Sequence, residues 1–130
     1  MGFAHHSRYV VWLEAARIEL LRTSGQSYRE WEASGVLLPV VGLEVEYLKP
    51  AYYDDELQIS TKIIELNRLR LSFEYAVFCP ARGLQVARAT SRHIFMNPEG
   101  RPMRLAPDRL SILSRLLANS PAAPAPEHTS

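Results

Sequence analysis

Residues 6–23 read HSRYVVWLEAARIELLRT, a segment whose apolar residues would cover more than one side of a helix. Most of them recur at i, i+4, i+7 and i+11, the spacing of an α-helix, and others stand beside these. They are Tyr9, Leu13, Ala16 and Leu20, flanked by Val10, Ile18 and Leu21. A helix on a protein surface keeps one clearly polar side. We therefore predict a helix over 6–23 that is wrapped by other structure.

The residues that follow predict where this helix ends and a shorter one begins. Gly25 supplies a C-terminal stop, with the basic Arg22 in the last turn. Ser27 then stands three residues before Glu30, which is the spacing of a capping box. We predict a short helix over 27–33, which Gly35 ends.

Beyond this point the apolar period changes from helical to alternating, which is typical of strands. Four strands are predicted, over 40–48, 56–65, 69–79 and 85–96. Short links between long strands predict antiparallel hairpins. These links are Asp54–Asp55, Asn67–Arg68 and Pro80–Gly83. The fourth strand carries a row of small side chains that would let a helix approach closely, namely Ala87, Ala89 and Ser91.

The order of these elements predicts an α+β fold, in which a curved antiparallel sheet is wrapped around the long helix. A short helix over 109–118, with Pro107 near its start, completes the pattern. The chain of 130 residues fits one domain, over 1–118. Residues 119–130 are rich in Pro and Ala without an apolar period, so we expect a disordered tail.

The composition argues against several classes of protein. Fifteen basic and fourteen acidic residues give a net charge of +1, without the basic surplus of a nucleic-acid or membrane-surface protein. The lone cysteine, Cys79, excludes an intrachain disulfide and a CxxC zinc site. No apolar run approaches the ~20 residues that span a bilayer, and no signal pattern precedes the first helix. We expect a cytoplasmic protein.

Two segments resemble the hot-dog-fold acyl-CoA thioesterases. They are GFAHHSRYVVWLEAAR at 2–17 and PVVGLEVEYLKPAYYDDELQIST at 39–61. The sequence is most similar to the subfamily of 4-hydroxybenzoyl-CoA thioesterase and the Tol-Pal-associated acyl-CoA thioesterases, and the similarity runs from Gly2 to Leu110. The resemblance implies a hot-dog fold that hydrolyses an acyl-CoA to a free acid and CoA without a cofactor. It also implies a homodimer or homotetramer, with the site between subunits.

The sequence departs from the family pattern at the catalytic carboxylate. The family motif is Asp-x-x-Gly, and if Gly2 is its glycine, the Asp and the strand that carries it fall upstream of Met1. Two explanations compete: a start assigned too late, or a chain that has lost its catalytic group. We favour the first, because the rest of the motif is intact and a buried helix without its supporting strand is physically awkward.

Thioester hydrolysis needs a donor for the carbonyl oxygen and a carboxylate or activated water for its carbon. A helix N-terminus offers free N–H groups and the positive end of the dipole, here near His5, His6 and Ser7. The resemblance implies that the His6 N–H polarises the thioester and that both His side chains line the site. The plainer interpretation is a polar helix entry capped by Ser7. Neighbouring residues on a helix diverge, so we expect no metal at the His pair.

Further candidate residues come with plainer alternatives. Glu14 resembles the helix carboxylate of other hot-dog thioesterases, although an ion pair with Arg17 is the simpler interpretation. Gly2, Ser7 and Tyr9 are assigned to substrate binding, with Tyr9 also suited to the core or a subunit contact. Trp12 and Trp31 suit packing better than acyl binding.

The CoA phosphates require basic or polar donors. The resemblance assigns this role to the hairpin after the second strand and to a basic group before the last helix. The residues concerned are Asn67, Arg68, Arg70 and Ser72, followed by Arg104. A solvated turn is the alternative for the hairpin. Three other features are given no catalytic role. Asp54 and Asp55 are expected to be turn residues, and Arg88 and Arg92 to face solvent. Cys79 has no nearby partner in the sequence that would activate it.

Two other functions remain open. The first is a non-catalytic hot-dog module that binds acyl-CoA or acyl-carrier protein, which an absent catalytic Asp would favour. The second is a hot-dog hydratase or dehydratase, for which no paired Asp and His arrangement is evident. In every case the expected partner is an acyl thioester rather than nucleic acid or membrane.

Overall fold

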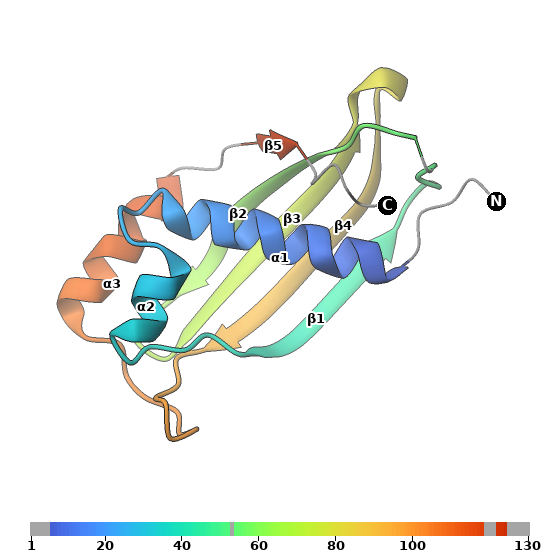
Figure 1. The fold of residues 1–130 in the computed structure, drawn as a ribbon. Coiled ribbons are helices and arrows are strands. Elements are labelled where there is room, and N and C mark those ends of the chain that lie inside the picture. Colours follow the sequence, from blue (N-terminus) through green and yellow to red (C-terminus); the bar gives the residue numbers. More distant parts are fainter. Residues whose placement is uncertain (1–5, 53, 119–121, 125–130) are drawn as a thin grey trace.

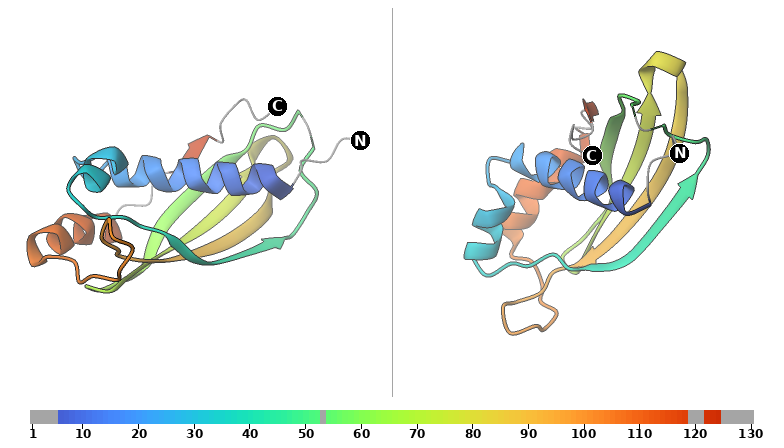
Figure 2. Two further views of the ribbon diagram at one scale, coloured as in Figure 1. Left: turned by 60° about the horizontal axis from the view of Figure 1, so that its bottom comes forward. Right: turned by 45° about the vertical axis from the view of Figure 1, so that its right-hand side comes forward.

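A five-stranded antiparallel sheet curls around one long helix, which lies across the concave face of the sheet (Figure 1). The computed structural model describes residues 6–52, 54–118 and 122–124. The elements in chain order are α1 (His6–Arg22), α2 (Tyr28–Ala33), β1 (Val40–Tyr47), β2 (Gln58–Leu66), β3 (Arg70–Cys79), the 3-10 turn η1 (Pro80–Arg82), β4 (Leu84–Ile94), α3 (Pro107–Ser114), the 3-10 turn η2 (Arg115–Ala118) and β5 (Ala122–Pro124). The curvature is plain in both views of Figure 2.

The strand order is β1-β4-β3-β2-β5, so only β2, β3 and β4 are joined by hairpins. The predicted hairpin at Asp54–Asp55 is wrong, because β1 pairs with β4 at the far side of the sheet. The connection over 48–57 is too long for a tight hairpin turn and crosses the end of the sheet instead. It places β1 at an edge.

The predicted burial patterns of β2 and β3 are confirmed. On β3, Leu71, Phe73, Tyr75 and Val77 are all fully buried on the concave face. On β4 the small residues pair in register with that row and lie buried beneath the helix, as expected from their size: Ala87, Ala89 and Ser91. From α1 the core receives Trp12, Leu13, Ala16, Leu20 and Leu21. Trp31 of α2 is also fully buried, in agreement with the predicted packing role.

The convex face carries cross-strand ion pairs that stabilise the pairing of β1 with β4. Arg88 Nε donates to Glu46 Oε1 at 2.8 Å, and Arg92 Nη1 to Glu44 Oε1 at 2.5 Å. Gly42 makes room for the second pair, since a Cβ there would lie 2.6 Å from Arg92 Nη2. Arg88 and Arg92 are exposed, which confirms the solvent-facing prediction.

The remaining elements follow their local sequence signals, with shifts at the ends. The last helix begins at Pro107, earlier than predicted, and closes in the turn η2. Ala122–Pro124 pair with the start of β2, so three residues of the expected tail lie in the sheet. Cys79 is buried at the end of β3 with a free thiol. Within the described ranges, no helix is long and apolar enough to cross a membrane.

The capping box predicted at the start of α2 is confirmed and generates a stability prediction. Ser27 Oγ accepts from the Glu30 N–H at 3.2 Å, and Glu30 Oε1 accepts from the Ser27 N–H at 2.8 Å. We expect Ser27→Ala to lower the free energy of unfolding by about 1 kcal/mol, because an N–H of the first turn loses its acceptor. Ser27→Asn keeps an acceptor and should lose much less in urea denaturation. Equal losses in both variants would contradict the capping role.

Candidate active site

The N-terminal end of α1 carries the helix-end donors expected from the sequence. The helix begins at His6, so the backbone N–H groups of its first turn have no partner within the helix and face away from it. Ser7 and Tyr9 lie in that same stretch of backbone, while their side chains are outside the described part of the chain. Gly2 and His5 lie outside the described residues altogether. The end of the helix therefore presents the positive end of the helix dipole.

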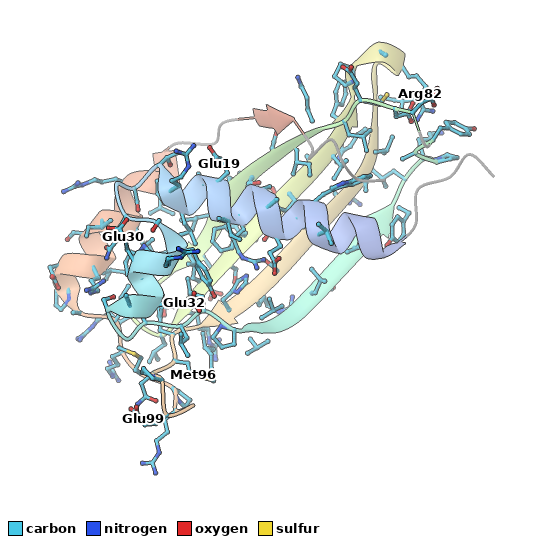
Figure 3. All side chains as sticks on the ribbon, in the orientation of Figure 1. Glu19, Glu30, Glu32, Arg82, Met96 and Glu99 are labelled. Atoms are coloured by element: carbon cyan, nitrogen blue, oxygen red, sulfur yellow. The ribbon has the colours of Figure 1, made fainter. Side chains whose placement is uncertain are left out.

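The connection between β1 and β2 lies at the same end of the molecule and is pinned by Arg82 (Figure 3). Arg82 Nη2 donates to the Pro50 carbonyl at 2.8 Å and to Asp55 Oδ2 at 2.6 Å. The same Asp55 oxygen accepts from the Tyr52 N–H at 2.7 Å, and the guanidinium stacks over the Tyr52 ring at 4.9 Å. Asp55 is thus a turn residue, as predicted. The role of Arg82 could not be read from the sequence, because its partners lie about 30 residues earlier.

The basic hairpin between β2 and β3 is a turn in which Asn67 and Arg68 make hydrogen bonds to the backbone. Asn67 Oδ1 accepts from the N–H groups of Leu69 and Arg70, at 2.8 and 2.9 Å. Arg68 Nε donates to the Leu105 carbonyl at 2.8 Å, which ties the hairpin to the segment before α3. Arg70 is exposed at the start of β3.

The other predicted phosphate ligands differ in exposure. Ser72 is buried and donates to Glu65 Oε1 at 3.0 Å, so its hydroxyl does not share the exposed surface of the hairpin. Arg104 is exposed in the segment before α3. The solvent-accessible part of the predicted phosphate set therefore consists of the hairpin tip and Arg104.

The structure does not bring the two halves of the predicted site together within one chain. The β2–β3 hairpin lies at the end of the sheet occupied by α2 and α3, whereas the N-terminus of α1 points to the opposite end (Figure 1). Both halves can meet only if a second copy supplies one of them. This separation is the main geometric constraint on any site built from these residues.

The helix carboxylate and its expected partner also lie apart. Glu14 is exposed on α1, and the ion pairs of the described residues do not include the predicted one between Glu14 and Arg17. Arg17 Nη1 instead donates to Tyr75 Oη at 3.4 Å, beneath the helix. The two side chains differ in exposure, since Glu14 is exposed whereas Arg17 is partly buried.

A buried polar chain runs on from Tyr75 across the concave face. Tyr75 Oη lies 2.6 Å from Ser91 Oγ, and Ser91 Oγ lies 2.8 Å from His93 Nε2. His93 Nδ1 lies 3.2 Å from the Leu38 carbonyl. The imidazole is only 1% exposed and packs edge-on against Phe73. The sequence signal for this chain was weak: a Ser and a His at two alternate, inward positions of an otherwise apolar strand.

His93 is held neutral. Burial disfavours the imidazolium and, together with the nearby charge of Arg17, lowers the pKa of His93 from 6.5 to about 4. The Leu38 and Pro39 backbone oppose this shift only in part. The imidazole is therefore uncharged at neutral pH.

This lowered pKa predicts how stability depends on pH. Between about pH 6.5 and 4 the unfolded chain binds a proton at His93 that the folded chain does not, so acid favours unfolding. The free energy of unfolding should fall through that window by up to about 3 kcal/mol on this account. His93→Gln has no such proton and should show a shallower slope in urea titrations at successive pH values. Parallel slopes for the two proteins would contradict the assignment.

Comparisons with known proteins agree on one family. The family model described as "Thioesterase-like superfamily" matches residues 1–130. A Bacillus subtilis relative, named "Putative acyl-CoA thioesterase YneP", is 35% identical over 99 residues, which cover 76% of this chain and 71% of the relative.

Solved structures of similar sequence share the fold. The hypothetical protein TT1821 of Thermus thermophilus superimposes with a TM-score of 0.81 at 36% identity, covering 89% of this chain and 88% of that one. The DHNA-CoA thioesterase of Staphylococcus aureus gives a TM-score of 0.82 at 29% identity, covering 91% of this chain and 81% of that one.

Proposed function

This chain belongs to the thioesterase-like superfamily, and we propose that it hydrolyses an acyl-CoA thioester to a free acid and CoA. The observation that carries the proposal is the family match over the whole chain, joined by relatives named as acyl-CoA thioesterases. The resemblance to hot-dog thioesterases and the predicted fold are confirmed by the same comparisons. A hydratase or a binding module has no comparable support.

We propose that the thioester carbonyl binds at the N-terminus of α1, with the His6 N–H as the donor to its oxygen. That donor stabilises the negative charge that develops when the carbonyl carbon is attacked. Support comes from the helix start at His6 and the free N–H groups of the first turn. The side chains of His5 and His6 would line the site beside Gly2, Ser7 and Tyr9.

We assign the catalytic carboxylate to an Asp upstream of Met1, in the family pattern whose glycine is Gly2. Glu14 is the alternative, and geometry limits it. It stands eight residues after His6, about 12 Å along the helix axis, so it cannot reach a carbonyl bound at the His6 N–H of its own chain. Glu14 could serve only in the site of a second copy.

A second copy would also complete the site through β1. The strand is an edge, and two apolar residues in register with the inward row of β4 are left uncovered: Leu43 is 40% and Tyr47 43% exposed. Such an edge invites pairing with another strand. Antiparallel pairing of two β1 strands reverses the second copy, so its β2–β3 hairpin comes to the same end as the first copy's α1 N-terminus. We therefore propose a homodimer in which Asn67, Arg68, Arg70 and, from before α3, Arg104 of one copy face the CoA bound at the other.

Two further assignments belong to the same proposal. The convex face, with its alternating acidic and basic side chains, leaves a surface on which two dimers could associate as a homotetramer. We place the protein in the cytoplasm, because its lone buried thiol needs no oxidising compartment.

The activity test is thiol release from a panel of short, branched and aromatic acyl-CoAs, run on this chain and on a version extended upstream to the expected Asp. Activity only in the extended version supports the assigned carboxylate. Activity in both transfers that role to Glu14 or to a water held at the His6 end of the helix. Binding of acyl-CoA without thiol release in either version would replace the thioesterase proposal with the binding module.

His6→Pro tests the carbonyl donor directly in whichever version is active. Proline is tolerated at the first position of a helix but has no N–H, so the helix should persist while the donor is lost. We expect kcat to fall by about 10²-fold or more. His6→Ala keeps the N–H and removes the imidazole, so it separates the two contributions. Equal kcat values for the proline variant and the parent would exclude this donor.

Leu43→Lys tests the proposed dimer. Pairing of two β1 strands would bury the lysine charge in the interface, which disfavours the dimer. Sedimentation velocity should therefore show a monomer. Leu117→Lys is the matched control, since Leu117 is 49% exposed in η2, away from β1. The control should sediment with the parent. A dimer that survives Leu43→Lys would require a different interface.

A further inference from the structure

The buried polar chain beneath α1 has only one consistent direction. The Leu38 carbonyl can only accept, so His93 Nδ1 carries the proton, and in a neutral imidazole Nε2 must then accept. Ser91 therefore donates its single hydroxyl proton to Nε2, and Tyr75 donates to Ser91. The Tyr75 oxygen is left to accept from Arg17. One backbone carbonyl thus orients every group in the chain.

This series of hydrogen bonds connects α1, the sheet and the segment before β1, whose relative positions matter for the proposed reaction. Arg17 belongs to α1, Tyr75 to β3, and Ser91 and His93 to β4. Leu38 lies in the segment that leads directly into the edge strand β1. The chain therefore spans the distance from the helix to the strand at which a second copy would pair.

Two kinds of contact hold α1 on the sheet: apolar packing and the hydrogen bond from Arg17 to Tyr75. Hydrophobic contact is not directional, and the β4 floor beneath the helix is the small-residue row that includes Ala87 and Ala89. Hydrogen bonds require defined distances and angles. The link from Arg17 to Tyr75 therefore supplies a constraint that the apolar surface lacks.

We propose that Arg17, Tyr75, Ser91 and His93 are positioning residues, which set the place of α1 relative to β1 and thereby aim the helix N-terminus at the thioester carbonyl. The inference rests on the proposed function for its catalytic consequence. None of the four touches the reacting atoms. Their effect passes through a rigid helix of 17 residues, and a shift of about 1 Å at a reacting group can cost 10²-fold in rate.

The kinetic test uses the active version of the protein and breaks the chain at two places. Tyr75→Phe keeps the ring and removes the hydroxyl, whereas Arg17→Met keeps the stem and removes the donor. We expect each to lower kcat by between about 10-fold and 100-fold with KM little changed. Both substitutions remove the same hydrogen bond between Arg17 and Tyr75. The kcat of the double variant should therefore be no lower than that of the slower single variant.

A conservative variant separates positioning from packing. Arg17→Lys restores a donor near Tyr75 and should recover part of the kcat that Arg17→Met loses. Variants that lose thermal stability but keep kcat, or single effects that multiply in the double variant, would overturn the proposal.

A second readout does not depend on thioesterase activity. In ¹⁵N-resolved NMR of the histidines, His93 should be neutral with its proton on Nδ1. Tyr75→Phe should raise hydrogen exchange together in the middle of α1 and in the segment leading into β1. A proton on Nε2, or faster hydrogen exchange confined to β3, would contradict the proposed series of hydrogen bonds even if the enzyme is active. If wild type releases no thiol while both signatures are present, the proposed function fails and the structural coupling stands.

Discussion

The apolar surface of α1 is the constraint on which the rest of the structure depends. A helix with apolar residues on more than one side cannot lie on a flat sheet without exposing some of them to water. The sheet curls around the side of α1 that carries Leu13, Ala16 and Leu20, and the small residues of β4 bring the strands close to the helix axis. The predicted wrapping on more than one side is wrong, because Val11 is 59% and Ile18 37% exposed. The curvature, in turn, leaves β1 as an edge with part of its apolar side uncovered. The curvature of the fold therefore follows from one segment near the N-terminus.

The sequence predicted what depends on neighbours along the chain. Alternation on β2 and β3 reports burial directly, and the capping box at Ser27 is a local pattern, so both were found correctly. The partner of β1 was not, because the link over 48–57 resembles a hairpin turn unless the partner strand is known. The row of Leu43, Val45 and Tyr47 predicted a buried side that one chain does not bury by itself.

The candidate site was predictable in its parts but not in its arrangement. A helix start near His6 and an Asn/Arg-rich hairpin can each be read from the sequence, yet nothing local indicates that they lie at opposite ends of the sheet. The buried chain was harder still. The partners of His93 come from α1, β3 and the segment before β1, and only the three-dimensional structure brings these elements together.

Cys79 has a practical bearing on studies of this protein. It is the only cysteine, and it is fully buried at the end of β3. A thiolate must be accessible to react, so a chromogenic thiol reagent will count released coenzyme without a contribution from the folded protein. The same burial makes the cysteine an intrinsic reporter. The rate at which the reagent labels Cys79 measures how often the sheet opens. A variant that loosens the core will therefore give a higher thiol signal in the absence of substrate.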